Sequence, residues 1–141
     1  MCLAPLILAG MLLTQDFNTT HNVRPKTDFN GAMIEAQTCE RGAGLDLKAS
    51  ASGLYGLALQ YGAGLDVHGW SITLTPKAGL AYVNRHTWEE AHPFNFEVGA
   101  QLLIGRDRWR VGVEYWHISN AYTSRPNHGI DTIAIQTGWT F

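Results

Sequence analysis

Three residues near the C-terminus carry side chains that together could hydrolyse an ester. They are His117, Ser119 and Asp131, which supply the base, the nucleophile and the orienting acid that acyl transfer through a serine needs. Residues two apart on a strand point to the same side, so His117 and Ser119 share a face with Cα atoms roughly 6.5–7 Å apart. Asp131 can approach the imidazole from the neighbouring strand. The sequence therefore predicts a Ser-His-Asp triad on a C-terminal hairpin.

The elements that position these residues are β-strands, because most of the chain alternates between apolar and small or polar residues with a period of two. Charged residues make up 16% of the chain and the mean hydropathy is −0.10, values that suit either a soluble sandwich or a membrane barrel. The pattern predicts seven strands, at 28–39, 43–51, 54–67, 70–84, 93–105, 107–119 and 130–141.

Three features favour an antiparallel transmembrane β-barrel of the outer-membrane type. The longer strands match the roughly 9–11 residues that a tilted strand needs to cross a bilayer. Short connections alternate with long polar ones, as between periplasmic turns and extracellular loops. Aromatic residues also gather at strand ends, as in the girdles of such barrels, at Trp70, Tyr82, Phe94, Trp109, Tyr115 and Trp139.

The N-terminal segment, residues 1–27, allows two interpretations. Its apolar run resembles a secretory signal peptide, although no basic residue precedes it and no clear cleavage site follows. An even number of strands instead requires an eighth strand between residues 3 and 15, followed by an outer loop at 16–27. Both interpretations leave residues 28–141 as one barrel domain with the candidate hairpin at its end. The C-terminal Phe141 resembles the signal that the barrel assembly machinery reads.

The parity of the last two strands places the candidate triad on the outer wall. His117 and Ser119 continue the apolar series that starts at Trp109, and Asp131 precedes Ile133 in the apolar series of the final strand. Ionisable groups on a lipid-facing surface are costly, by on the order of 2–4 kcal/mol near the membrane centre and less near its surface. Three polar residues that make up a nucleophile, a base and an acid therefore favour a catalytic explanation.

Two short motifs carry a resemblance to a known family. Residues 117–121 read His-Ile-Ser-Asn-Ala, and residues 126–131 read Pro-Asn-His-Gly-Ile-Asp. This segment resembles the His-x-Ser-Asn-Ala and Pro-Asn-x-Gly-Ile-acid signature of the lipid A 3-O-deacylases, with the strongest match over 111–141. The resemblance implies an eight-stranded barrel that hydrolyses the ester-linked acyl chain at the 3 position of lipid A, without a metal or other cofactor.

The resemblance also implies roles for individual residues. Ser119 corresponds to the nucleophile, His117 to the base and Asp131 to the acid, which in the family is usually a glutamate. Asn120 and Asn127 are the candidates for the oxyanion hole and substrate binding, or are turn formers. A glycine that the family places three residues after the serine is Tyr122 here.

Other candidate sites are weaker. The loop that contains His86, Glu89, Glu90 and His92 has no recognised spacing of metal ligands and is interpreted as a solvated loop. The formal net charge of −2 gives no reason to expect a nucleic acid partner. Of the two cysteines, Cys39 is expected to be a buried thiol.

The sequence therefore predicts an esterase in the bacterial outer membrane, with its active site at the outer leaflet and lipid A or lipopolysaccharide as substrate. Two alternatives remain open. One is a non-catalytic small barrel with a structural or adhesion role, and the other is a phospholipase-like barrel with a different lipid substrate.

Overall fold

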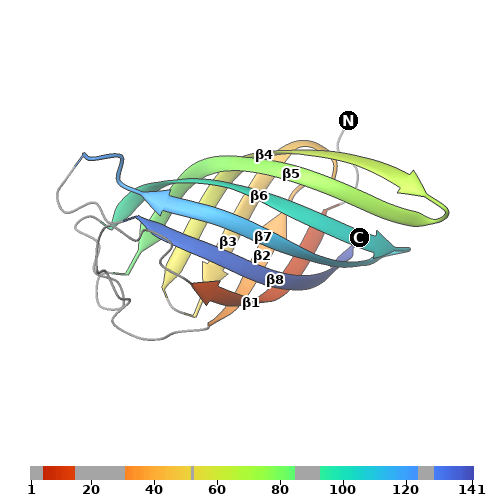
Figure 1. Ribbon diagram of the computed structural model, residues 1–141, viewed down its shortest axis with the longest axis horizontal. Helices are drawn as coiled ribbons and strands as arrows, with labels where there is room; N and C mark the ends of the chain where they lie inside the picture. Colours follow the sequence, from red (N-terminus) through yellow and green to blue (C-terminus); the bar gives the residue numbers. More distant parts are fainter. Residues whose placement is uncertain (1–4, 15–30, 52, 85–92, 124–128) are drawn as a thin grey trace.

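The computed structural model describes residues 5–14, 31–51, 53–84, 93–123 and 129–141. Eight antiparallel strands form a closed barrel (Figure 1). The strands are β1 (Leu6–Thr14), β2 (Ala32–Gln37), β3 (Gly42–Ser50), β4 (Leu54–Val67), β5 (Trp70–Val83), β6 (Phe94–Arg106), β7 (Trp109–Ser119) and β8 (Ile130–Thr140). This architecture confirms the predicted fold class, and the seven strands expected from the sequence each correspond to one of β2 to β8.

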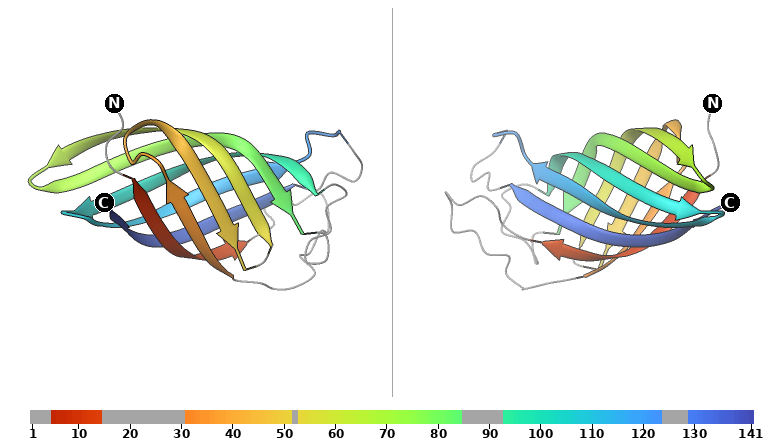
Figure 2. Two further views of the ribbon diagram at one scale, coloured as in Figure 1. Left: turned by 180° about the vertical axis from the view of Figure 1, so that it is seen from behind. Right: turned by 45° about the vertical axis from the view of Figure 1, so that its right-hand side comes forward.

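The barrel closes between its first and last strands. Every strand pairs with the next one along the chain, and β1 also pairs with β8, from Leu6 opposite Thr140 to Thr14 opposite Thr132. Figure 2 shows β1 between β2 and β8. The structure thus uses Leu6–Thr14 as a strand, while the loop expected at 16–27 lies outside the described residues.

The outer wall of the barrel is apolar. Large side chains such as Leu59, Leu80 and Val98 are more than half exposed. On β5 the outward face begins with Trp70 and ends with Tyr82, twelve residues further on, which corresponds to ~40 Å along the strand. At a tilt of about 45° this becomes roughly 28 Å along the barrel axis, the thickness of a bilayer core. The described residues include no helix long and apolar enough to cross a membrane.

Charged side chains fill the middle of the barrel interior. The Lys48 ammonium lies 2.9 Å from Asp46, 3.0 Å from Glu97 and 3.0 Å from Glu114. Lys77 lies 3.1 Å from both Asp46 and Glu114. Burying a charge without a partner costs several kcal/mol, so these groups hold strands that are far apart in the sequence in one fixed arrangement.

Amides and a second ion pair continue the polar interior. Gln101 donates to the side-chain oxygen of Gln136 at 2.7 Å and accepts from Gln37 at 2.7 Å. Further along, Arg110 forms a bidentate pair with Glu40, at 2.6 and 2.9 Å. Because these buried side chains occupy the interior, the polar groups that can meet a lipid are those on the outer wall.

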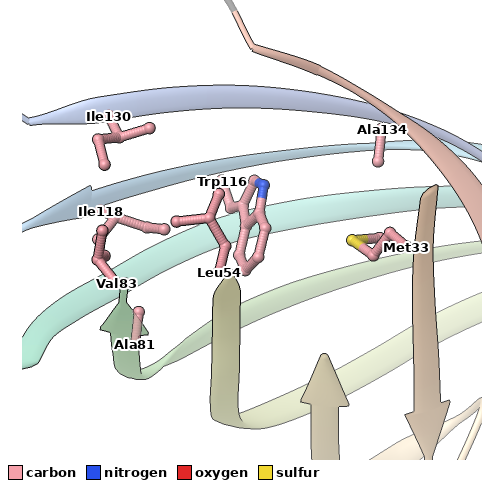
Figure 3. Packing of buried hydrophobic residues seen from close by; sticks show 8 residues of the cluster. All are labelled: Met33, Leu54, Ala81, Val83, Trp116, Ile118, Ile130 and Ala134. Atoms are coloured by element: carbon pink, nitrogen blue, oxygen red, sulfur yellow. The ribbon is translucent and has the colours of Figure 1, made fainter. Parts of the chain in front are cut away.

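An apolar cluster occupies the interior at the end of the barrel where β7 ends and β8 begins (Figure 3). Trp116 is 1% exposed, and the Lys48 ammonium lies 4.5 Å from the centre of its ring. The cluster therefore joins the charged layer below it to the strand ends that carry the candidate site. Its members are Met33, Leu54, Ala81, Val83, Trp116, Ile118, Ile130 and Ala134.

Cys39 is buried as expected, but it is not a thiol. Its side chain is buried, with 3% of its surface exposed. It is disulfide-bonded, so the expectation of a free thiol is wrong. The spacing of two cysteines in a sequence does not reveal whether they approach each other in the fold.

Candidate functional site

His117 and Asp131 face each other across neighbouring strands. They are directly opposite in the register of β7 and β8, and His117 Nδ1 lies 2.9 Å from Asp131 Oδ1. The His117 side chain is 37% exposed and that of Asp131 is 13% exposed. With the Nδ1 proton donated to the carboxylate, the lone pair on Nε2 is available to accept a proton, as a general base requires.

Alternation along the strands explains why these side chains point outward. Trp116 and Ile118 flank His117 in the sequence, and both are fully buried in the apolar cluster of the interior (Figure 3). Ile130 belongs to the same cluster and precedes Asp131. Because neighbouring residues of a strand point to opposite faces, anchoring these three residues inside fixes His117 and Asp131 on the outer wall.

Ser119 ends β7 on the same face as His117. It lies opposite Phe96 of β6, whose side chain is half exposed on the outer wall. Ser119 itself is partly exposed. Among the described residues no hydrogen bond joins its hydroxyl to His117. The structure therefore brings the predicted base and acid into contact and places the predicted nucleophile on the same wall, without a hydrogen bond between Ser119 and His117.

A tight turn follows Ser119. The Thr123 amide donates to the Asn120 carbonyl oxygen at 3.0 Å, and the φ angles of Ala121 and Tyr122 are 50° and 62°. Two consecutive positive φ angles with this hydrogen bond define a type I′ turn, which favours glycine or asparagine. Tyr122 thus has the left-handed backbone conformation that is easiest for glycine.

Asn120 holds this turn from within the barrel. Its side chain is fully buried, one residue after the end of β7, and its Oδ1 accepts a hydrogen bond from the Tyr122 amide at 2.9 Å. That position gives Asn120 a structural role in the turn, on the opposite face from Ser119. Asn127, the other residue expected at the oxyanion hole, lies outside the described residues, as does the loop at 85–92 with its histidines and glutamates.

Tyr115 contacts the candidate site in a way that the sequence did not reveal. Its hydroxyl donates to Asp131 Oδ1 at 2.6 Å, the same oxygen that contacts His117 Nδ1. From the sequence, Tyr115 is interpreted as an interfacial aromatic. The sequence did contain a clue, because Tyr115 lies two residues before His117 and therefore on the same face of the strand. A long side chain at that position can reach the residue diagonally opposite on the neighbouring strand, which is Asp131.

Gly129 packs against the imidazole of His117. Its φ angle is +68°, and a Cβ atom there would lie 3.0 Å from His117 Cε1 and 3.6 Å from Nε2. Glycine at this position therefore allows a left-handed backbone and leaves room for the ring in the orientation that contacts Asp131.

If His117 is the base of the predicted triad, replacing Gly129 with alanine is expected to reduce ester hydrolysis by about 10- to 100-fold, because the new methyl group displaces the imidazole from its contact with Asp131. The turnover number, measured on purified and folded barrel, checks this result. The matched control is Gly69→Ala, because Gly69 has a φ of +82° but no atom within 4 Å of the added Cβ. Backbone strain is similar in both variants, so equal loss of activity would contradict the steric argument.

The fold and this geometry define a class of protein. A closed antiparallel barrel with an apolar outer wall and a packed polar interior is the architecture of small outer-membrane barrels. An imidazole–carboxylate pair on the same face as a serine is suited to ester hydrolysis. The chain thus has the fold of an outer-membrane barrel, with side chains on its wall that are of the kinds a hydrolase uses.

Comparisons with known proteins identify the family. The profile of the lipid A 3-O-deacylase (PagL) family matches residues 37–140, and the chain belongs to this family. A search of the curated proteins found no match. The chain is similar in fold to a solved structure titled "Crystal structure of the outer membrane enzyme PagL", with a TM-score of 0.59 and 17% identity over 96% of this chain and 98% of that one. Membership confirms the predicted class, an ester hydrolase of the bacterial outer membrane.

Proposed function

We propose that this protein removes the 3-O-linked acyl chain of lipid A from within the outer leaflet, with Ser119, His117 and Asp131 as its catalytic triad. The hydrogen bond of 2.9 Å between His117 and Asp131 carries this proposal. A carboxylate and an imidazole are energetically costly on an outer wall that faces lipid. Their presence on that wall therefore favours a function for them. Family membership supports lipid A as the substrate.

The proposed reaction begins when Ser119 Oγ attacks the ester carbonyl of the acyl chain while His117 Nε2 accepts the hydroxyl proton. Asp131 stabilises the imidazolium and keeps its Nδ1 proton directed at the carboxylate. The tetrahedral intermediate collapses when the bond to the sugar oxygen breaks and His117 returns the proton to that oxygen. Water then hydrolyses the acyl-enzyme in the same manner and releases a fatty acid.

Two adjustments complete this mechanism. Ser119 rotates about its side-chain bonds to reach Nε2 when substrate binds, since catalytic hydrogen bonds often form fully only in the substrate complex. We assign the oxyanion hole to the loop between β7 and β8, with Asn127 as its side-chain donor. Tyr122 does not supply its amide in the observed turn, because that amide donates to Asn120.

The location of the site fits this substrate. The end of β7 and the start of β8 lie at one end of the barrel (Figure 1), and the bounds of these strands place His117, Ser119 and Asp131 there. Apolar outward side chains continue below them on the same strands, at Val111, Val113 and Ile135. A lipid acyl chain would lie against this wall while the sugar meets the loops.

Mass spectrometry of lipid A tests the proposal. Lipid A from bacteria that express the protein should lack the mass of one ester-linked acyl chain compared with lipid A from cells without it. A serine-directed fluorophosphonate probe should also label Ser119 in the folded barrel. Unchanged lipid A together with no labelling would favour a non-catalytic barrel, and release of fatty acid from glycerophospholipids alone would indicate a phospholipase.

A further inference from the structure

The Asp131 carboxylate has a second hydrogen-bond donor besides the imidazole. The Tyr115 hydroxyl donates to Asp131 Oδ1 at 2.6 Å, while His117 Nδ1 lies 2.9 Å from the same atom. A donor–acceptor distance of 2.6 Å falls in the range of charge-assisted O–H···O⁻ bonds. One carboxylate oxygen is thus fixed from two directions by two outward-facing side chains of β7.

The position of Tyr115 explains how its hydroxyl reaches the acid. On β7 it lies two residues from His117 on the side away from the loop, and on β8 its register partner is Ile133. Its ring therefore lies between Asp131 and the more deeply placed apolar wall. The Asp131 side chain is 13% exposed, whereas that of His117 is 37% exposed. Tyr115 thereby provides the hydrogen bond that water would give a carboxylate in a solvated site.

We propose that Tyr115 is a positioning residue of this hydrolase, one that acts through Asp131 to hold the imidazole of His117 in its catalytic orientation and tautomer. The proposal rests on the function proposed above. Among the described residues, the Tyr115 hydroxyl forms no hydrogen bond with either of the reacting groups, Ser119 Oγ or the Nε2 atom of His117. Its hydroxyl limits the rotation of a short carboxylate, so that Oδ1 remains directed at Nδ1.

Tyr115 differs from the outward-facing tyrosines of other strands because its hydroxyl donates to a carboxylate, that of Asp131. Tyr61 of β4 is 60% exposed on the outer wall, and its hydroxyl has no hydrogen-bond partner among the described residues. Tyr55 and Tyr82 contact each other through their rings, with centroids 6.0 Å apart. An interfacial tyrosine can direct its hydroxyl to water or to lipid headgroups, whereas the Tyr115 hydroxyl donates to one particular carboxylate.

The first test is Tyr115→Phe, which removes only the hydroxyl, with Tyr61→Phe as the matched control. We expect Tyr115→Phe to lower kcat by about 10- to 100-fold, the value of one hydrogen bond to a charged group. KM should change less than twofold, and the rate of fluorophosphonate labelling should fall by the same factor as kcat. Tyr61→Phe should change none of these quantities. Unchanged kcat, or a rise in KM alone, would overturn the proposal.

A double-mutant cycle tests whether Tyr115 acts through the acid. If it does, adding Tyr115→Phe to Asp131→Asn should cause almost no further fall in kcat, because the carboxylate that Tyr115 holds is already replaced. Equal loss in both backgrounds would show that Tyr115 acts elsewhere, and would contradict the proposal.

Nitrogen NMR of histidine-labelled protein provides a readout that does not depend on activity. In the wild-type barrel the resonances of His117 should show the tautomer protonated at Nδ1, and Tyr115→Phe should reduce its population. If wild type neither deacylates lipid A nor reacts with the probe, the proposed function fails; a tautomer shift in Tyr115→Phe would still support the positioning role. An unchanged tautomer population would refute it.

Discussion

Replacing Ser119 with alanine is expected to reduce acyl release by on the order of 10⁴-fold or more, while the folded barrel persists. In the proposed mechanism the hydroxyl oxygen of Ser119 forms the bond of the acyl-enzyme. On the outward faces of β7 and β8, no other serine or threonine hydroxyl is near the His117–Asp131 pair. Lipid A from cells that express the variant should therefore keep its full set of acyl chains, as measured by mass spectrometry.

The folded state of this variant can be checked independently. Folded outer-membrane barrels migrate differently on gels before and after heating, and Ser119→Ala should retain this difference because its side chain is on the outer wall and outside the buried networks. A matched control is Ser71→Ala, where the hydroxyl contacts Arg41 at the opposite end of the barrel. That variant should deacylate normally. Full activity of Ser119→Ala would refute its role as nucleophile.

The second large effect is expected for Asp131→Asn, with a fall in kcat of about 10³- to 10⁴-fold. The amide of asparagine can donate to His117 Nδ1, which favours the tautomer protonated at Nε2, and that nitrogen then cannot accept the serine proton. Thermal unfolding should occur at the same temperature or slightly higher, because the substitution removes a charge from the outer wall. Kinetic assays and calorimetry on the purified barrel measure the two quantities.

Asp131→Glu serves as the control for this prediction because it keeps the carboxylate and adds one methylene. It should retain activity within about tenfold of wild type, since the acid can still orient the imidazole. If Asp131→Asn were as active as wild type, the hydrogen bond between Asp131 and His117 would be a contact of the barrel wall without a role in catalysis. Loss of the folded barrel in Asp131→Asn would instead show that the carboxylate is needed for stability.

The strands and their outward faces could be predicted because the barrel places two different environments on alternate residues. The outward face of β7 is apolar, with Trp109, Val111 and Val113, and its inward face is polar, with Arg110 and Glu114. Alternation with a period of two therefore predicts which residues face outward and which face inward. The same parity predicted that His117 and Asp131 would share the outer wall. Their contact then follows from the hairpin register, and the structure shows it directly.

The remaining features depend on contacts that no local pattern encodes. Lys48 and Glu114 are 66 positions apart in the chain, and only closure of the barrel brings them to 3.0 Å. The hydrogen bond from Tyr115 to Asp131 needs a diagonal reach between strands as well as a suitable rotamer. Asn120 could be assigned to a turn or to an oxyanion hole from its type alone, and its buried side chain, which accepts a hydrogen bond from the Tyr122 amide, could not be foreseen from the sequence.

The register of the last hairpin links assembly to activity. His117 lies opposite Asp131 in the pairing of β7 with β8, and a shift of β8 by a single residue would carry Asp131 into the interior and Thr132 to the outer wall. Such a barrel would still be closed and rich in β-structure, yet it would lack the acid beside the imidazole. Under the proposed mechanism, deacylation would also report on assembly: an active molecule must have its final strand in the correct register, which spectroscopy of secondary structure does not detect.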